Sequence, residues 1–307
     1  MFSEEVNRVT TGDENPPFNY SERSNTLFRG KSSINQGAFE IEFIMPKNLP
    51  TELISGKFSG FAYDANGEFA NGSSVNSLIG GLEPSPVADN TAPSIRLFLG
   101  DTTFIPGGIV GPNTKIVAFL TDEHGINLSA SPTGNEIKAS LDGSPTVILN
   151  DYYYSNPNNY KKGSLTYPLD GLEKGKHTLT LSASDTYNNQ STASVDFVVT
   201  DGDQIQIEEF SNYPNPFYES TTLEFTHTRS GEDLEAYLTI YDLTGKEMMN
   251  QSFEVISSQY RVMLTQWEGK SATGTKLSQG IYLGKLSVRS QVDGSKNEQF
   301  TKLIILN

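Results

Sequence analysis

Short segments in which apolar and polar residues alternate recur along the chain, and this period-two pattern constrains the fold more than any other feature. Turn signals such as Asp142-Gly143 and Asn188-Asn189 separate the segments. Such alternation is typical of half-buried β-strands. The clearest segments in the middle of the chain are residues 94–99, 115–120, 136–141, 146–149, 164–169, 177–184 and 194–199. Seven short strands in this stretch predict a sandwich of two sheets.

The composition also favours strands over helices. Hydrophobic residues make up 36% of the 307 residues and aromatic residues 10%, while Thr, Ser, Asn and Gly are plentiful. The sequence therefore predicts an all-β protein of tandem immunoglobulin-like β-sandwich domains, without helices. Pro-, Ser- and Asp-rich stretches place the boundaries as follows: a partial N-terminal β domain at 1–81, a linker at 82–93, an immunoglobulin-like sandwich at 94–200, a linker at 201–209 and a small C-terminal β-sandwich at 210–307.

Two further strand predictions come from the ends of the chain. AFEIEFIMP, residues 38–46, alternates Phe39, Ile41 and Phe43 with Glu40, Glu42 and Ile44, and predicts a half-buried strand before a proline stop. Residues before about Asn25 are polar, and we expect them to pack poorly. The C-terminal KLIIL, residues 302–306, is apolar on both faces and requires either cover on both sides or a partner.

Net charge and the absence of cysteine exclude several function classes. The formal net charge is −15 and the sequence pI about 4.6. Because phosphate backbones repel an acidic surface, we expect no nucleic-acid partner. The chain contains no cysteine, which excludes a thiolate nucleophile and disulfides within it. The first residues lack an apolar segment, so we expect the export signal to lie elsewhere.

Histidines and acidic loops give little support for catalysis or metal binding. His124, His177 and His227 fall in separate segments without metal-ligand spacing, and we interpret them as strand or edge residues. Asp122, Asp185 and Asn188 lie in two loops and have side-chain oxygens of the kind that calcium prefers. The interpretation we favour is that they bond their own turns, so no cofactor is expected and calcium is the alternative.

A tyrosine-rich loop and a single tryptophan are the remaining candidates for ligand or partner binding. Tyr152, Tyr153 and Tyr154 lie in the loop NDYYYSNPNNY and can stack on a sugar or contact a partner. Packing against the neighbouring sheet is the interpretation we favour. Lys161 and Lys162 follow the loop and offer a weak anionic contact. Trp267 is the only tryptophan, and we expect it to fill the core of the C-terminal domain.

The C-terminal block carries an ordered set of motifs, namely YPNPF, TTLEF, IYDLTGKEM, WEGKSATGTKLSQGIYLGKLSV and KLIIL. As a set they resemble the C-terminal sorting domain of type IX secretion cargo, a small β-sandwich, over residues 210–307. In that family the domain docks to an outer-membrane β-barrel shuttle of the PorV type. The resemblance implies the following motif and partner-binding residues: Pro214, Asn215, Pro216, Phe217, Asp242, Leu243, Gly245, Trp267, Gly269, Gly280 and Tyr282.

The upstream blocks extend the resemblance to nearly the whole chain from about Phe18. LFRGKSSINQGAFEIEFIMPKNL, GFAYDANGEFANG and NDYYYSNPNNYKKGSLTYPLDGLEKGKHTLTLSASDTYNN resemble the region that follows the protease domain in type IX sortases, which are related to gingipain cysteine peptidases. The resemblance implies a parent protein at the outer-membrane surface that cleaves sorting domains from cargo and passes the cargo to an anionic lipopolysaccharide. No catalytic residue is carried over, because the His-Cys pair of the family lies in a protease domain that this sequence does not contain.

The sequence therefore predicts a non-enzymatic accessory region of a cell-surface C-terminal signal peptidase. We expect it to position the protease domain of the parent protein and to bind an outer-membrane barrel partner. A surface adhesin or glycan-binding protein with a sorting tail is the alternative, and binding through the loop at Tyr152, Tyr153 and Tyr154 distinguishes it. A free-standing serine or metal hydrolase is a third hypothesis, which peptidase activity of the purified chain would support.

Overall fold

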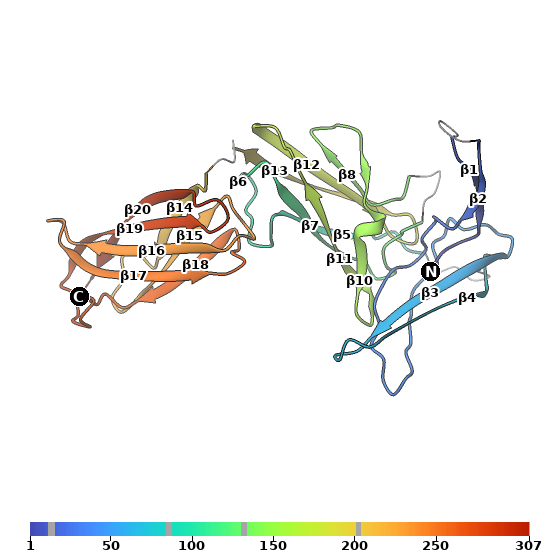
Figure 1. The fold of residues 1–307 in the computed structure, drawn as a ribbon, viewed down its shortest axis with the longest axis horizontal. Helices are drawn as coiled ribbons and strands as arrows, with labels where there is room; N and C mark the ends of the chain where they lie inside the picture. Colours follow the sequence, from blue (N-terminus) through green and yellow to red (C-terminus); the bar gives the residue numbers. More distant parts are fainter. Residues whose placement is uncertain (12–15, 84–87, 130–133, 201–203, 307) are drawn as a thin grey trace. The chain divides into compact units, whose positions relative to one another are not determined.

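The computed structural model describes residues 1–11, 16–83, 88–129, 134–200 and 204–306 (Figure 1). These residues form two compact units. The first comprises Met1–Leu97, Ala118–Thr166 and Leu179–Ser194, and the second Phe98–Val117, Tyr167–Thr178 and Val195–Asn307. The fold is all-β, as predicted: the only helix in the described part of the chain is the 3-10 turn η1 (Asn150–Tyr152). No helix among the described residues is long and apolar enough to cross a membrane.

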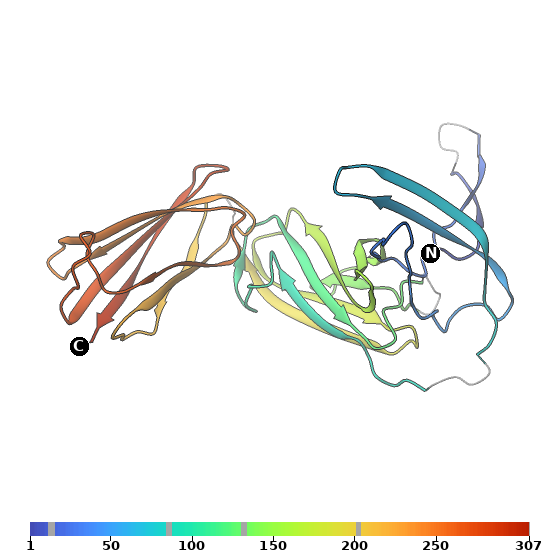
Figure 2. The same cartoon turned by 90° about the horizontal axis from the view of Figure 1, so that it is seen from below.

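The N-terminal region contains two antiparallel hairpins. Strand β1 (Val6–Val9) pairs with β2 (Asn19–Glu22), and both strands are largely exposed, as expected for residues before Asn25. Strand β3 (Ile54–Tyr63) pairs with β4 (Phe69–Ile79) across a turn in which Asp64 Oδ1 accepts hydrogen bonds from two backbone amides. Figure 2 shows the β3–β4 hairpin as a long two-stranded ribbon.

The strand predicted at residues 38–46 is wrong. No ladder forms there, although the chain is partly buried at Ile41, Phe43 and Ile44. The aromatic rings pack on other rings instead: Phe43 stacks on Phe28 with centroids 4.5 Å apart, and Phe39 on Phe58 at 6.2 Å. Alternation did not predict which side chains face inward, since Phe39 is 55% exposed and Ile44 is partly buried. It also did not show whether a partner strand lies beside the segment, because a partner supplies hydrogen bonds that the local pattern does not encode.

The seven strands predicted for the middle of the chain are all present, and together with two that the pattern did not predict, β6 and β10, they fall into two sheets. Their order is β10-β11-β7-β5 in one sheet and β6-β13-β12-β8-β9 in the other. The bounds are β5 (Ser94–Leu99), β6 (Ile109–Val110), β7 (Thr114–Thr121), β8 (Lys138–Leu141), β9 (Val147–Ile148), β10 (Tyr153–Asn156), β11 (Asn159–Leu169), β12 (Gly175–Ser184) and β13 (Gln190–Val199). Alternate residues of β7 and β12 are buried, which is the pattern of a sandwich face.

The C-terminal domain is a second sandwich, seen in yellow to red in Figure 1. One sheet has the order β14-β15-β18 and the other β17-β16-β19-β20. The bounds are β14 (Ile207–Tyr213), β15 (Thr221–His227), β16 (Leu234–Tyr241), β17 (Glu247–Val255), β18 (Arg261–Trp267), β19 (Gly280–Ser290) and β20 (Lys296–Ile305). The inner residues of β16 have no exposed surface, as their alternation predicted: Leu234, Ala236, Leu238 and Ile240.

Candidate functional site

The segment Ser211–Phe217 forms a bend at which β14 ends and the chain turns towards β20. The peptide bonds before Pro214 and Pro216 are cis. Between them, the side-chain amide of Asn215 bonds the backbone of β20 in the way that a neighbouring strand would. Its Nδ2 donates to the backbone oxygen of Lys302 over 2.7 Å, and its Oδ1 accepts from the amide of Ile304 over 3.0 Å. The bend is therefore held to the last strand of the domain by side-chain hydrogen bonds.

Phe217 anchors the bend in the core. Its amide donates to the oxygen of Ile304 over 3.0 Å, and its own oxygen accepts from the amide of Leu306 over 2.8 Å. The ring is buried and lies 5.7 Å from the ring of Trp267, centroid to centroid. Backbone pairing and ring burial together fix the bend against the edge of the apolar C-terminal strand. Of the two faces of that strand, the one with Leu303 and Ile305 is buried, whereas Ile304 on the other is only partly buried.

Trp267 lies in the core of the C-terminal domain, which confirms the expected placement. Its Nε1 donates to the oxygen of Lys270 over 2.9 Å. Gly269 follows with φ at 67°, and a Cβ there would lie 3.2 Å from Ile305 Cδ1. The left-handed backbone and the close approach both favour glycine at this position. Tyr282 meets the tryptophan edge-on at 6.5 Å.

The DLTG motif is a hydrogen-bonded turn between β16 and β17. Asp242 Oδ1 accepts from the amides of Thr244 and Lys246 over 2.8 and 3.0 Å, and from the Thr244 hydroxyl over 2.7 Å. The Thr244 hydroxyl bond and these amide bonds lower the pKa of the Asp242 carboxyl below its ordinary value. Gly245 takes a φ of 84°, which an L side chain rarely adopts. Leu243 is left 76% exposed at the tip.

The sorting-domain motifs meet at one end of the C-terminal domain, which we call the motif end. The strand register places them there: Tyr241, just before the DLTG turn, pairs with Leu283, while Gly280 and Phe217 both pair with Ile305. The motif end comprises Tyr213–Tyr218, Asp242–Gly245, Trp267–Gly269, Gly280–Tyr282 and the last residues of β20. Its exposed apolar and aromatic side chains are Tyr213 (81%), Tyr218 (62%), Leu243 and Ile281 (42%).

The opposite end of the same domain packs on residues of the preceding segment within the second unit. Asp101 accepts hydrogen bonds from the Ser230 hydroxyl and the amide of Tyr260. The Tyr260 ring lies 5.0 Å from the ring of Phe104, and its hydroxyl donates to Glu208. Burial raises the pKa of the Glu208 carboxyl, although the Tyr260 bond opposes this shift.

His227 is fully buried at that end. Its Nδ1 accepts from the amide of Arg229 over 3.1 Å, and Nε2 lies 2.8 Å from the oxygen of Gln259. One nitrogen therefore accepts and the other donates, which is the pattern of a neutral imidazole. Burial lowers the pKa of His227 to about 4. Each ring nitrogen thus has a backbone hydrogen-bond partner, which agrees with the interpretation of His227 as a structural residue of its strand.

The acidic loops of the middle region form turns, as the favoured interpretation predicted. Asp122 Oδ1 accepts from the amide of His124 over 2.7 Å, and Asp185 Oδ1 from the amides of Tyr187 and Asn189 over 2.8 Å each. Asn188 does not join them in a ligand set, because its Oδ1 accepts from the side-chain amides of neighbouring asparagines.

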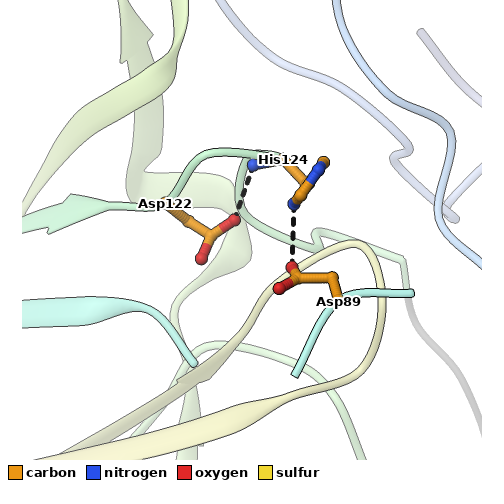
Figure 3. A group of neighbouring side chains, drawn as sticks. All are labelled: Asp89, Asp122 and His124. Carbon is orange, nitrogen blue, oxygen red and sulfur yellow. Dashed lines mark hydrogen bonds and ion pairs between the residues drawn. The ribbon is translucent and has the colours of Figure 1, made fainter. Parts of the chain in front are cut away.

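The sequence did not single out Asp89, which completes a compact group in this region. In Figure 3 the His124 ring points towards Asp89, with Nδ1 2.8 Å from Asp89 Oδ2, while Asp122 bonds the backbone amide of His124. One potential ligand atom each from Asp89, Asp122 and His124 lies within 4.8 Å of the others. Burial raises the pKa of Asp122, and the charges of Asp185 and Asp89 raise it further. No local signal marks Asp89, because it reaches the group from a linker distant in sequence.

The tyrosine-rich segment expected to be a loop is instead the turn η1, which contains Tyr152, and the strand β10, which contains Tyr153 and Tyr154; the three side chains differ in environment. Tyr153 is buried, which agrees with the packing interpretation for that residue. Tyr154 is 45% exposed, but its ring is covered by cations, with the Arg29 guanidinium 5.3 Å and the Lys31 ammonium 6.0 Å from the ring centre. Tyr152 is exposed beside them. The segment therefore does not present three free rings to one ligand.

Comparison with known proteins supports the motif assignment. Residues 211–305 match the family described as a secretion system C-terminal sorting domain. No curated protein matches the chain. Among solved structures, the chain is similar to dimeric latent PorU from Porphyromonas gingivalis at 28% identity, with a TM-score of 0.39, over 99% of this chain and 28% of that protein. The chain thus spans less than a third of the length of PorU.

Two other solved structures show lower identity. One is the protein SGBP-B of a mixed-linkage glucan utilization locus of Bacteroides ovatus, in complex with a heptasaccharide: 14% identity, 99% of this chain, 60% of that chain and a TM-score of 0.31. The other comprises fibronectin(III)-like modules of CbhA from Clostridium thermocellum: 8% identity, 69% of this chain, 94% of that chain and a TM-score of 0.28. Residues 211–305 are a C-terminal sorting domain, and this supports a role for the chain in type IX secretion.

Proposed function

We propose that this chain is the non-catalytic region of a type IX signal peptidase at the outer-membrane surface, and that its C-terminal domain docks to an outer-membrane β-barrel of the PorV type. Cleavage of sorting domains from cargo belongs to a cysteine peptidase domain of the parent protein, since the sequence has no cysteine. The observation that carries the docking role is that the separate sorting motifs form one end of one domain.

The motif end has the chemistry of a protein contact. Tyr213, Tyr218, Leu243 and Ile281 expose apolar or aromatic surface at positions where the backbone is already fixed. Docking there requires little ordering of the backbone, because the Asn215 bonds and the Asp242 turn hold the two loops. Exposed tyrosines on a rigid support are typical anchors of protein interfaces.

The test is a pull-down of the purified barrel with the whole 307-residue chain and with variants. We expect Tyr213→Ala combined with Leu243→Ser to weaken capture, by about tenfold or more in dissociation constant if they act as interface anchors. The matched control is Tyr63→Ala, a 70% exposed tyrosine of β3 that lies outside the sorting domain. Full capture after removal of residues 210–307 would refute docking through this domain.

The β3–β4 hairpin supports the second part of the proposal, contact with the peptidase domain. Phe61, Tyr63 and Phe69 are 65 to 70% exposed, and Phe61 lies 5.8 Å from Phe69 and 6.3 Å from Tyr63. An exposed aromatic cluster on a two-stranded sheet is unstable in water without a cover. A domain that packs on this face would hold the hairpin and the peptidase together.

Hydrogen exchange tests that contact. We expect the amides of β3 and β4 to exchange more slowly in the chain joined to the peptidase domain of its parent protein than in the chain alone. The amides of β16 serve as an internal control, since the C-terminal core is complete without the peptidase. Equal exchange of β3 and β4 in both samples would count against this contact and leave the docking proposal unaffected.

A further inference from the structure

The outer face of the sheet β17-β16-β19-β20 carries a hollow of about 430 Å³ that neither the motif end nor the core explains. Ser287 of β19 lies at its centre and pairs laterally with Tyr237 of β16 and Glu298 of β20. On its own strand the outward neighbours are Lys285 and Arg289. A small side chain surrounded by four long ones leaves a depression, which we call the outer-face hollow.

The Ser287 hydroxyl is a polar group that the described residues do not satisfy. It is 7% exposed, and its oxygen has no hydrogen-bond partner among them. Buried hydroxyls are normally paired, since an unmade hydrogen bond leaves the desolvation of the group uncompensated. Ser287 lines the outer-face hollow, so a ligand that displaces the long side chains over its hydroxyl can bond that group.

Charge in the hollow favours a ligand with negative or acceptor groups. Glu298 is bonded by Lys285 over 2.8 Å and by Lys296 over 3.0 Å. Glu235 lies 3.6 Å from Arg289. Three cations therefore face two carboxylates that are already paired, although the chain as a whole has a net charge of −15. Guanidinium and ammonium groups carry more donors than these contacts use, so donors are in excess.

Two aromatic rings and the position of the hollow over the inner strands narrow the chemical class of the ligand. Tyr237 and Tyr241 lie four residues apart on the same face of β16, which is roughly 13 Å along a strand, with Thr239 between them. Tyr237 is 46% exposed. The centre of the hollow lies over β16 and β19, which pair with strands on both sides, so a ligand there contacts side chains and does not add a strand. Rings and hydroxyls at this spacing suit pyranose units.

We propose that the outer-face hollow binds an oligosaccharide that carries carboxylate groups. A carboxylate pairs with Arg289, a sugar hydroxyl bonds the Ser287 oxygen, and the apolar face of a pyranose lies on the Tyr237 ring. This site is on the sheet face, whereas the proposed docking contact is at the motif end. The two can therefore be tested separately.

Isothermal titration of the full chain with oligogalacturonate tests the proposal, with a neutral galactose oligomer and oligoglutamate as parallel ligands. We expect binding of oligogalacturonate only. Tyr237→Ala, Arg289→Gln and Ser287→Val should each weaken it, Arg289→Gln by about tenfold, since it removes a charge-assisted pair. The matched controls are Tyr20→Ala and Arg8→Gln, because Tyr20 and Tyr237 are similarly exposed, 40% and 46%, and so are the side chains of Arg8 and Arg289, 53% and 55%.

Melting temperature verifies that each variant is folded before titration. Arg289 and Tyr237 are exposed enough that their substitution leaves the core intact, so at least two variants remain informative if Ser287→Val is unstable. No binding of oligogalacturonate would overturn the proposal. So would equal binding of oligoglutamate, which would indicate an acidic peptide site, or oligogalacturonate binding that Arg289→Gln and Tyr237→Ala leave unchanged.

Discussion

The C-terminal domain and the β3–β4 hairpin are built from similar antiparallel strands, but they differ in whether a second layer covers the apolar side chains of those strands. In the domain, the inward residues of β16 face a second sheet, and Leu238 has no exposed surface. In the hairpin, the described residues provide no second sheet, and Phe61 and Phe69 remain exposed. Apolar residues on a strand contribute to stability only when another layer removes them from water. Equal substitutions in the two regions should therefore have very different consequences.

Deletion from Lys302 onwards should have the largest effect. The deletion removes the buried side chains of Leu303 and Ile305, each worth roughly 1.5–3 kcal/mol, and the bonds that hold Phe217. We expect the C-terminal domain to unfold, seen as the loss of its melting transition in calorimetry and circular dichroism. The point substitution Lys302→Ala is the control and should melt like the unaltered chain. A truncated protein that keeps the transition would contradict this expectation.

The substitutions Phe217→Ala and Phe61→Ala compare how much a buried and an exposed phenylalanine ring contribute to the free energy of unfolding. Phe217 is 1% exposed and Phe61 65%. We expect the first substitution to lower the free energy of unfolding by about 3–5 kcal/mol and the second by less than about 1 kcal/mol. Urea denaturation measures both. Similar losses would show that the hairpin face is covered in the isolated chain.

His227 should make the stability of the C-terminal domain dependent on pH. Its pKa is about 4 in the fold and near 6.5 when unfolded, so below pH 6.5 the unfolded chain binds more protons. Stability is therefore fully present above pH 6.5 and decreases by about 3 kcal/mol as the pH falls to 4. NMR titration of the imidazole provides the direct measurement.

The partly buried His177 is the internal control for that titration, since it lies on a strand of the middle region. A His227 midpoint near 6.5 would remove the predicted dependence. The groups facing His227 are the amide of Arg229, the oxygen of Gln259 and, at longer range, the charge of Asp101, which opposes the shift.

Asn215→Ala should have a smaller effect than these changes. It removes two hydrogen bonds that connect the bend to β20, at 2.7 and 3.0 Å, and should cost about 1–2 kcal/mol in unfolding free energy. Asn66→Ala in the β3–β4 turn is the matched control, because its side chain bonds only Asp64 at the surface. We expect it to change stability by less than about 0.5 kcal/mol. Equal effects would mean that the bend is not held by Asn215.

Calcium should have the smallest effect. Asp122 and Asp185 already accept backbone amide bonds, and Asp89 is paired with His124, so adding a cation would displace existing partners. We expect the melting temperature to be the same with millimolar calcium and with a chelator. A rise of several degrees with calcium, abolished by Asp122→Asn, would instead assign a cation site to these loops.

Local pattern was sufficient for most of the strands and for the sorting motifs. The strand at Ser94–Leu99 was predicted residue for residue, and the inward side of β16 followed from alternation alone. The DLTG motif was identifiable because an aspartate that caps a turn and a glycine in the left-handed region are local requirements. By contrast, the strand expected around Ile41 is absent, because pairing depends on a partner elsewhere in the chain.

The features of the candidate sites also divide into those that the sequence predicts and those that depend on the tertiary structure. The sequence by itself determined the all-β class, the absence of thiol chemistry and the order of the sorting motifs, since these depend on composition and on neighbouring residues. Only the tertiary structure decided that the bend at Asn215 reaches β20, that Asp89 joins His124, and that Ser287 lies at the centre of a hollow. Lateral strand register creates those contacts, and register is fixed by the packing of whole sheets rather than by any one segment.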